Sequence, residues 1–146
     1  MNIEKVLVPE YKELIKIWEG SVRATHDFLT ESDILFYREM LTKQNFKGIE
    51  LFCIKNDRKE ILAFMGILED KIEMLFVCPF HIRKGLGSEL IKYAVEKCKV
   101  KKVDVNEQNH KALKFYEELG FKLLSRSESD EAGNPFPILH LSLIDN

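Results

Sequence analysis

The sequence contains only three cysteines, Cys53, Cys78 and Cys98, and they are far apart. An odd number of cysteines at such spacing predicts neither a disulfide framework nor a cluster of metal ligands, so we expect no bound metal. Each cysteine has apolar neighbours, which is typical of a small buried side chain. Cys78 is also a candidate nucleophile because it directly precedes the glycine-containing loop described below, and that role would need a nearby base.

Long apolar runs and a large net charge are also missing. The longest nearly apolar run, Met74–Phe80, is far too short to cross a bilayer. The N-terminus has charged residues from the start and no apolar signal segment, so we expect no secretion, no membrane partner and a cytoplasmic protein. The net charge of −2 predicts no general attraction to nucleic acid.

What is present fits one globular domain. A chain of 146 residues can bury one substantial core but is short for two, and 45% hydrophobic with 32% charged residues argues against disorder. There is no internal repeat, low-complexity tract or linker, so we expect residues 1–146 to form a single domain. The composition leaves both a monomer and a homodimer open.

Apolar periodicity predicts the element order β-α-α-β-β-β-α-β-α-β-β, which is an α+β sheet with helices on both faces. Short charged turns between the middle strands predict antiparallel hairpins. Ser21–Leu29 is expected to be an irregular helix end and a loop. The expected strands are Asn2–Val8, Glu50–Lys55, Ile61–Leu68, Ile72–Cys78, Lys101–Val105, Phe121–Ser127 and Ile138–Ile144. The expected helices follow Pro9, follow the N-cap residue Thr30, and cover Gly85–Cys98 and Asn109–Leu119.

A glycine-containing loop, Arg83–Ser88, joins a predicted strand to a predicted helix. Free amides at a helix start and the helix dipole both favour an anion such as phosphate. Gly85 and Gly87 let the backbone approach a ligand closely, and Arg83 and Lys84 add positive charge. The third glycine of the dinucleotide-binding motif is missing and no Gly-Lys-Ser/Thr follows. A helix start that merely tolerates glycine is therefore the alternative.

Two segments resemble motifs of the GNAT N-acyltransferase superfamily. Phe76–Ile91 resembles its motif A, a strand ending in V-x-P that runs into R/Q-G-x-G-x-G/A and a helix. Val105–Phe121 resembles its motif B, in which V-x-x-x-N precedes A-x-x-F-Y-x-x-x-G-F. Ser21–Leu29 and Gly133–Leu141 are similar to segments of the YjaB-like bacterial acetyltransferase subgroup. The order and separation of the motifs match, and the resemblance covers nearly the whole chain.

The resemblance implies a GNAT-like mixed, largely antiparallel sheet and acetyl-CoA as the acyl donor. An acetyl or other short acyl group would pass from coenzyme A to a primary amine by direct attack in a ternary complex. The sequence departs from motif A at Ile82 and Arg83, where the family has Arg or Gln and the first glycine. The residues that the resemblance assigns to coenzyme A binding are Phe76 and Val77 by their main chain, the loop residues Arg83, Lys84, Gly85, Leu86, Gly87 and Ser88, and Asn109, which could also cap its helix.

Three residues are catalytic candidates by the same resemblance. Tyr116 lies where the family commonly has the general acid for the coenzyme A thiolate; a core aromatic is the alternative. Glu73 lies where several members have a glutamate facing the amine, and strand alternation predicts that it shares a face with Leu75 and Val77. A solvent-facing position explains Glu73 equally well. His26 titrates in the useful range and lies in a loop expected to line the acceptor pocket; a surface or hydrogen-bonded core position is the alternative.

The acceptor is an amine of a small molecule or a peptide. We expect its pocket to be shaped by Trp18–Leu29, the second helix and Glu128–Pro137, with His140 facing it from the last strand. A metabolite amine, an antibiotic, a peptide N-terminus and a protein lysine all stay open. The alternative function is a GNAT-fold regulatory module that binds acyl-CoA without turnover, which the substituted Ile82 and the lack of an unambiguous base would favour.

Overall fold

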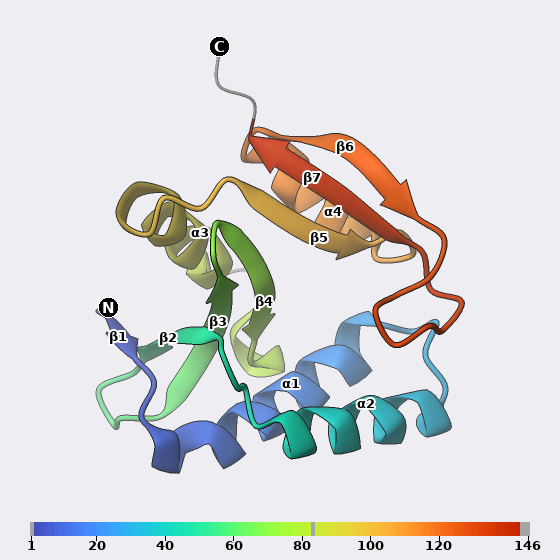
Figure 1. Ribbon diagram of the computed structural model, residues 1–146. Helices are drawn as coiled ribbons and strands as arrows, with labels where there is room; N and C mark the ends of the chain where they lie inside the picture. The colour runs from blue at the N-terminus through green and yellow to red at the C-terminus, as the bar shows by residue number, and fades with distance from the viewer. Residues whose placement is uncertain (1, 83, 144–146) are drawn as a thin grey trace.

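In the computed structural model, which describes residues 2–82 and 84–143, seven strands form one continuous sheet in the order β1-β2-β3-β4-β5-β7-β6 (Figure 1). Neighbouring strands are antiparallel except β4 and β5, which are parallel. The strands are β1 (Ile3–Lys5), β2 (Glu50–Lys55), β3 (Ile61–Leu68), β4 (Lys71–Val77), β5 (Lys102–Asn106), β6 (Phe121–Ser127) and β7 (Ile138–Leu143).

Two helices cover each face of the sheet (Figure 1). The core against α1 and α2 is centred on Leu14, Trp18 and Phe64, and the core against α3 and α4 includes Leu90 and Phe121. The helices are α1 (Tyr11–Thr25), α2 (Glu31–Gln44), α3 (Leu86–Lys97) and α4 (His110–Glu118), with short 3₁₀ turns at Val8–Glu10 and Pro79–His81. None of these four helices is long and apolar enough to span a membrane. The predicted α+β class, with a mixed, largely antiparallel sheet, is confirmed.

The prediction of an irregular segment over Ser21–Leu29 is wrong for its first half, because α1 continues to Thr25. Ser21 and Val22 are buried against the sheet, and the Thr25 hydroxyl donates a 2.7 Å hydrogen bond to the Ser21 carbonyl. Burial of this helical face outweighs the low helix propensity of Gly20. The last residue of the predicted strand Ile138–Ile144 lies outside the described residues.

A β-bulge in β4 changes the direction of one candidate residue. The register of β3 and β4 shifts between Gly66 and Ile67, so Glu73 is an extra residue on β4 in their described pairing. The prediction that Glu73 shares a face with Leu75 and Val77 is therefore wrong. Those two side chains pack against the α3–α4 core, whereas Glu73 lines a cavity on the α1–α2 side.

Candidate active site

The site is built where β4 and β5 separate. The two parallel strands pair at only two described positions, Lys71 with Lys102 and Ile72 with Val103. Beyond Ile72 they diverge, as Figure 1 shows. The main chain near the end of β4 is paired with β3 on one side and is not paired with β5 on the other. This free edge can pair with an extended ligand in the manner of an added strand.

The first cavity, which we call the donor cavity, measures about 450 Å³ and lies between β4, the start of α3 and α4. Six of the residues that line it are Val77, Gly85, Gly87, Ser88, Asn109 and Tyr116. Most of the residues expected to hold coenzyme A are thus brought together. Two described residues are exceptions: Lys84 does not line the cavity, and the Phe76 side chain points to the other face and packs on Phe64 with ring centroids 5.7 Å apart.

The start of α3 presents free amides to the donor cavity. Gly85 is the N-cap in the left-handed region, at φ 78°, where a side chain would be strained. The first intrahelical hydrogen bond runs from Glu89 N to Gly85 O at 3.0 Å. The helix therefore does not use the amides of Leu86, Gly87 and Ser88, which are the groups that bind phosphate at helix starts.

Gly87 is also needed for the contact between α3 and α4. A Cβ at this position would lie 3.3 Å from Phe115 Cζ, so the branches of a valine would force the two helices apart. We expect Gly87→Val to weaken coenzyme A binding about tenfold or more, measured by calorimetry, because the shifted loop amides lose hydrogen bonds to the phosphate, each worth about 1.5–3 kcal/mol. Gly20→Ala is the matched control, since its Cβ would be in ordinary contact with Pro79 at 3.5 Å. An unchanged affinity in Gly87→Val would contradict this account of the loop.

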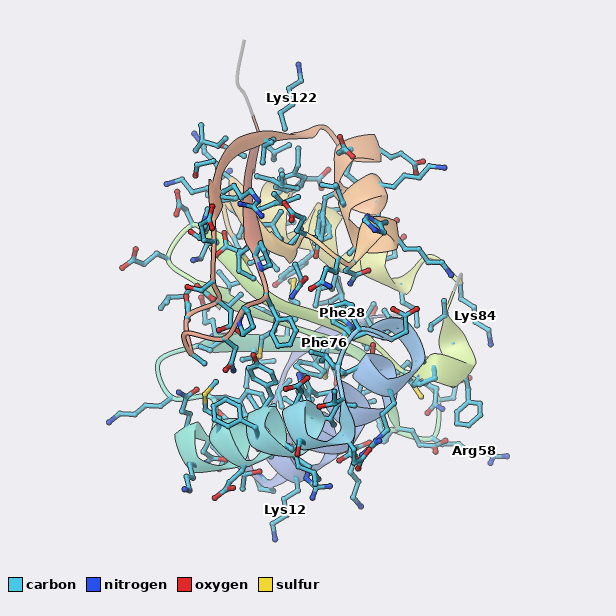
Figure 2. The ribbon with its side chains drawn as sticks, turned by 90° about the vertical axis from the view of Figure 1, so that its right-hand side faces the viewer. Lys12, Phe28, Arg58, Phe76, Lys84 and Lys122 are labelled. Atoms are coloured by element: carbon cyan, nitrogen blue, oxygen red, sulfur yellow. The ribbon has the colours of Figure 1, made fainter. Side chains whose placement is uncertain are left out.

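The basic side chains around the loop are only partly as predicted. Lys84 is exposed, projects from the molecule in Figure 2, and its Nζ lies 3.3 Å from His81 Nδ1. The prediction for Arg83 falls on a residue outside the described part of the chain. Lys111, in the first turn of α4, lines the donor cavity and was not predicted, although its place beside the N-cap residue Asn109 was a signal for it. Asn109 caps α4, with its Oδ1 accepting from Ala112 N at 3.2 Å.

Tyr116 lines the donor cavity and is only 6% exposed. It packs edge-to-face on Phe115 and Phe121, with ring centroids 5.1 and 5.6 Å away. Burial raises the pKa of the Tyr116 phenol above its ordinary value. The phenol therefore keeps its proton at neutral pH, which is the form that can donate to a thiolate.

The second cavity, which we call the acceptor cavity, measures about 320 Å³ and lies on the α1–α2 side of β4. All three segments predicted to shape an acceptor pocket contribute to its walls. Phe76, which is labelled in Figure 2, also lines this cavity. Its lining combines aliphatic side chains with three carboxylates and several aromatic rings, among them Glu73, Asp130, Glu131, Trp18, Tyr37 and Phe136. Among the described residues, no lysine or arginine lines it. Such a lining suits a cation.

A polar clasp joins α2 to the loop between β6 and β7 across this cavity. The Tyr37 hydroxyl donates to Asp130 Oδ2 and accepts from Asn134 Nδ2 at 2.8 Å. Asn134 N also donates to Asp130 Oδ1 at 2.8 Å, which fixes the loop. Burial and the neighbouring Asp130 carboxylate raise the pKa of Tyr37 well above its ordinary value. The clasp holds the loop's carboxylate over the acceptor cavity, and no local sequence pattern signals it.

His26 follows the last turn of α1 and is the one described residue that lines both cavities. Its Nδ1 lies 2.8 Å from Thr25 Oγ1, whose own proton is donated to Ser21 O. His26 Nδ1 must therefore carry a hydrogen and donate it to Thr25, which leaves the Nε2 lone pair free to accept a proton. Burial lowers the pKa of His26, against a smaller opposing effect of Asp27, so the ring is neutral at neutral pH.

Two other candidates lie elsewhere. His140 does not face the acceptor cavity as predicted; it lines a neighbouring cavity of about 340 Å³ outside β5 and β7, which we call the side cavity. Strand alternation next to Leu139 and Leu141 does place His140 on the face of the acceptor cavity, but its hydrogen bond to Asp104 on β5 holds it in the side cavity. Cys78 lies beside Pro79 and Phe80 in a shallow depression, away from the donor cavity. Cys53 is buried as predicted, and burial raises its pKa to about 11.

Comparison with known proteins agrees with this geometry. The profile of the acetyltransferase (GNAT) domain family matches residues 24–139. The peptidyl-lysine N-acetyltransferase YjaB of Salmonella typhimurium is 35% identical over 144 residues, covering 97% of each chain. The solution structure of apo-form YjaB from Escherichia coli superposes with a TM-score of 0.88 at 31% identity, covering 99% of this chain and 98% of that one.

A more distant structure shares the fold. The PaiA N-acetyltransferase of Thermoplasma acidophilum, crystallised in complex with coenzyme A, has a TM-score of 0.70 at 20% identity and covers 97% of this chain and 99% of its own. The expected resemblance to the family and to the YjaB-like subgroup is confirmed, and the enzyme rather than the binding module is the supported reading. The chain belongs to the acetyltransferase (GNAT) domain family and is an N-acetyltransferase that takes the acetyl group from acetyl-CoA and transfers it to an amine.

Proposed function

We propose that the amine is the ε-amino group of a lysine in a peptide or protein. The observation that carries the proposal is the acceptor cavity, where Glu73, Asp130 and Glu131 surround a space also lined by aromatic rings. Carboxylates and ring faces bind an alkylammonium group better than they bind a neutral or anionic acceptor. The name of the YjaB relative, a peptidyl-lysine N-acetyltransferase, supports the same acceptor class.

The assigned roles follow from which cavity each side chain lines. His26 Nε2 accepts the proton that the amine loses, because His26 is shared by the two cavities and its free nitrogen is unprotonated. Tyr116 donates its proton to the leaving sulfur from inside the donor cavity. Glu73 binds the ammonium form of the acceptor and holds it beside His26.

Acetyl-CoA supplies the acetyl group and the thiol leaving group. The amine nitrogen forms a bond to the acetyl carbon while the carbon–sulfur bond breaks, giving an acetylated lysine and coenzyme A. The ammonium that Glu73 binds first loses one proton to solvent, and the neutral amine then attacks. His26 takes the second proton from the attacking nitrogen, and Tyr116 gives one to the leaving sulfur. Transfer of a proton from His26 back to Tyr116 restores both residues, so each turnover of a charged lysine releases one proton. Direct attack in one ternary complex needs no covalent enzyme intermediate, which agrees with the position of Cys78 outside the donor cavity.

Coenzyme A binding is assigned to the free edge of β4 and the start of α3. The main chain of Phe76 and Val77 would pair with the extended arm of the ligand, because β5 does not occupy that edge. The amides of Leu86, Gly87 and Ser88 would bind the pyrophosphate, with Lys84, Lys111 and Arg83 as the nearby cations. Asn109 would contact the arm while capping α4. Three further points stay predictions: residues 1–146 form one domain, the protein is cytoplasmic, and it is a monomer or a homodimer.

Thiol release from acetyl-CoA tests the acceptor class. A peptide with a blocked N-terminus and one lysine should support release, and the same peptide with arginine at that position should not. The polyamine spermidine serves as a small cationic amine for comparison. Turnover with spermidine but with no lysine peptide from a varied set would overturn the proposed acceptor, while leaving the transferase activity in place.

A further inference from the structure

Five polar side chains form a continuous chain of hydrogen bonds across four strands. The Lys71 ammonium lies 3.0 Å from Glu73 Oε1 on β4 and 3.0 Å from Asp104 Oδ2 on β5. Asp104 Oδ1 lies 2.7 Å from His140 Nδ1 on β7, and His140 Nε2 lies 2.6 Å from Ser127 Oγ on β6. Because a carboxylate only accepts, His140 Nδ1 carries a hydrogen and donates it to Asp104, while His140 Nε2 and the Ser127 hydroxyl share the next hydrogen bond. Every link then has one donor and one acceptor.

Lys71 stands at the first of the two positions where β4 and β5 pair, directly before Ile72, beyond which the strands separate. Glu73, two residues later, is the extra residue of the β4 bulge. A bulged residue has no cross-strand neighbour to fix its direction, and Glu73 lines both the acceptor cavity and the side cavity. The ion pair with Lys71 selects one direction for the Glu73 carboxylate.

The pairs in this chain are more sheltered than ordinary surface ion pairs. The side chains of Lys71, Glu73 and Asp104 are 26%, 17% and 21% exposed. Burial works against the charge of Lys71, but the hydrogen bonds that it donates to Asp104 and Glu73 outweigh burial and raise the pKa of Lys71, which stays charged. The other close pair on the side cavity, Lys102 with Asp70 at 3.8 Å, is about half exposed and screened by water.

The charges of Lys71, Glu73 and Asp104 do not cancel. The Lys71 ammonium lies between two carboxylates, which leaves one excess negative charge shared by Glu73, which lines the acceptor cavity, and Asp104, which lines the side cavity. If Lys71 had only Glu73 as a partner, it would neutralise that carboxylate and the cavity would lose attraction for a cationic acceptor. Asp104, fixed by His140, takes up part of the Lys71 charge and prevents this.

We infer that Lys71 is a positioning residue for Glu73, and that Asp104, His140 and Ser127 hold Lys71 so that Glu73 keeps its charge toward the acceptor. The inference rests on the proposed function, because it uses Glu73 as the group that binds the acceptor ammonium. It assigns no contact between Lys71 and the reacting atoms. A substitution of Lys71 should therefore change the KM for the acceptor and kcat by different factors.

Steady-state kinetics with a lysine peptide separate the effect of the Lys71 charge from the effect of the Asp104 charge. In Lys71→Met, no lysine charge compensates the carboxylates that face the acceptor ammonium, and Glu73 is no longer fixed in direction. The acceptor should therefore bind at least as tightly as in the parent enzyme, but it should lose its proton less readily. We expect kcat to fall about tenfold without a rise in KM. Asp104→Asn should do the opposite and raise KM about fivefold with a smaller change in kcat. Lys71→Arg should restore kcat.

Lys102→Met is the matched control, because it removes a lysine of the same cavity whose printed ion-pair partner is Asp70 rather than Glu73. A kcat for Lys71→Met that equals the kcat of Lys102→Met would overturn the inference, as would equal rises in KM for Lys71→Met and Asp104→Asn. Thermal melting and coenzyme A affinity identify a variant that fails to fold. In that case Asp104→Asn and Lys71→Arg decide the question.

The Glu73→Gln background distinguishes this inference from the proposed function. Lys71→Met should produce no further change in KM or kcat there, since the two residues act as a unit. Fully additive effects would overturn the positioning role while leaving the proposed function intact. A Glu73→Gln enzyme with unchanged KM and kcat would instead show that the proposed role of Glu73 is wrong.

Discussion

Tyr116→Phe is expected to lower kcat about 100-fold while leaving coenzyme A affinity nearly unchanged. The variant keeps the ring that packs on Phe115 and Phe121 and removes only the hydroxyl group. Loss of a positioned general acid costs typically two to four orders of magnitude in rate, so ~100-fold is the lower end of that range. Detection of the coenzyme A thiol released during turnover gives kcat, and calorimetry with coenzyme A gives the affinity.

Tyr93→Phe is the control for the loss of a phenol. Tyr93 lies on α3 and packs on Phe52 with ring centroids 5.3 Å apart, and it lines neither the donor nor the acceptor cavity. Its variant should turn over like the parent enzyme. If Tyr116→Phe lost affinity and kcat in proportion, Tyr116 would be a wall of the cavity rather than a proton donor. If both stayed unchanged, the leaving thiolate would take its proton from another group.

The parts of the fold that the sequence predicts well are those set by local pattern. Three strands, Glu50–Lys55, Ile61–Leu68 and Phe121–Ser127, have the predicted bounds, because charged or glycine-containing turns mark their ends. The loop at Gly85 and the N-cap at Asn109 are also local, since each depends on residues within one helical turn. The same is true of the capping box at Thr30, which starts α2.

The features that the sequence does not predict depend on strand register and on contacts between residues far apart in the chain. Alternation along β4 gave the wrong face for Glu73 because the bulge is a property of the β3–β4 pair and not of β4 alone. The clasp joins Tyr37 to Asp130, 93 residues away, and only the fold brings them together. Asp104 is a charged residue between two buried valines, and alternation could have placed it on the outer face, although not beside His140.

His26→Gln is expected to lower kcat/KM about 100-fold at neutral pH and to change its pH dependence. The active form of the enzyme has a neutral His26, so the parent's kcat/KM should fall as the pH drops through the pKa of this ring. Burial lowers that pKa, which places the fall below the ordinary histidine value of 6.5. Ionisation of the acceptor amine, with an ordinary pKa near 10.4, gives a separate rise on the alkaline side. Only the acid limb should disappear in the variant.

His110→Gln is the control for this limb, because His110 is exposed at the start of α4 and lines neither cavity. Thr25→Val tests the tautomer, since the hydroxyl that accepts from His26 Nδ1 is removed while the volume of the side chain is kept. With no partner for Nδ1, the hydrogen can move to Nε2, so kcat should fall without loss of coenzyme A affinity. An acid limb that persists in His26→Gln would exclude His26 as the base and leave that role to a carboxylate of the acceptor cavity.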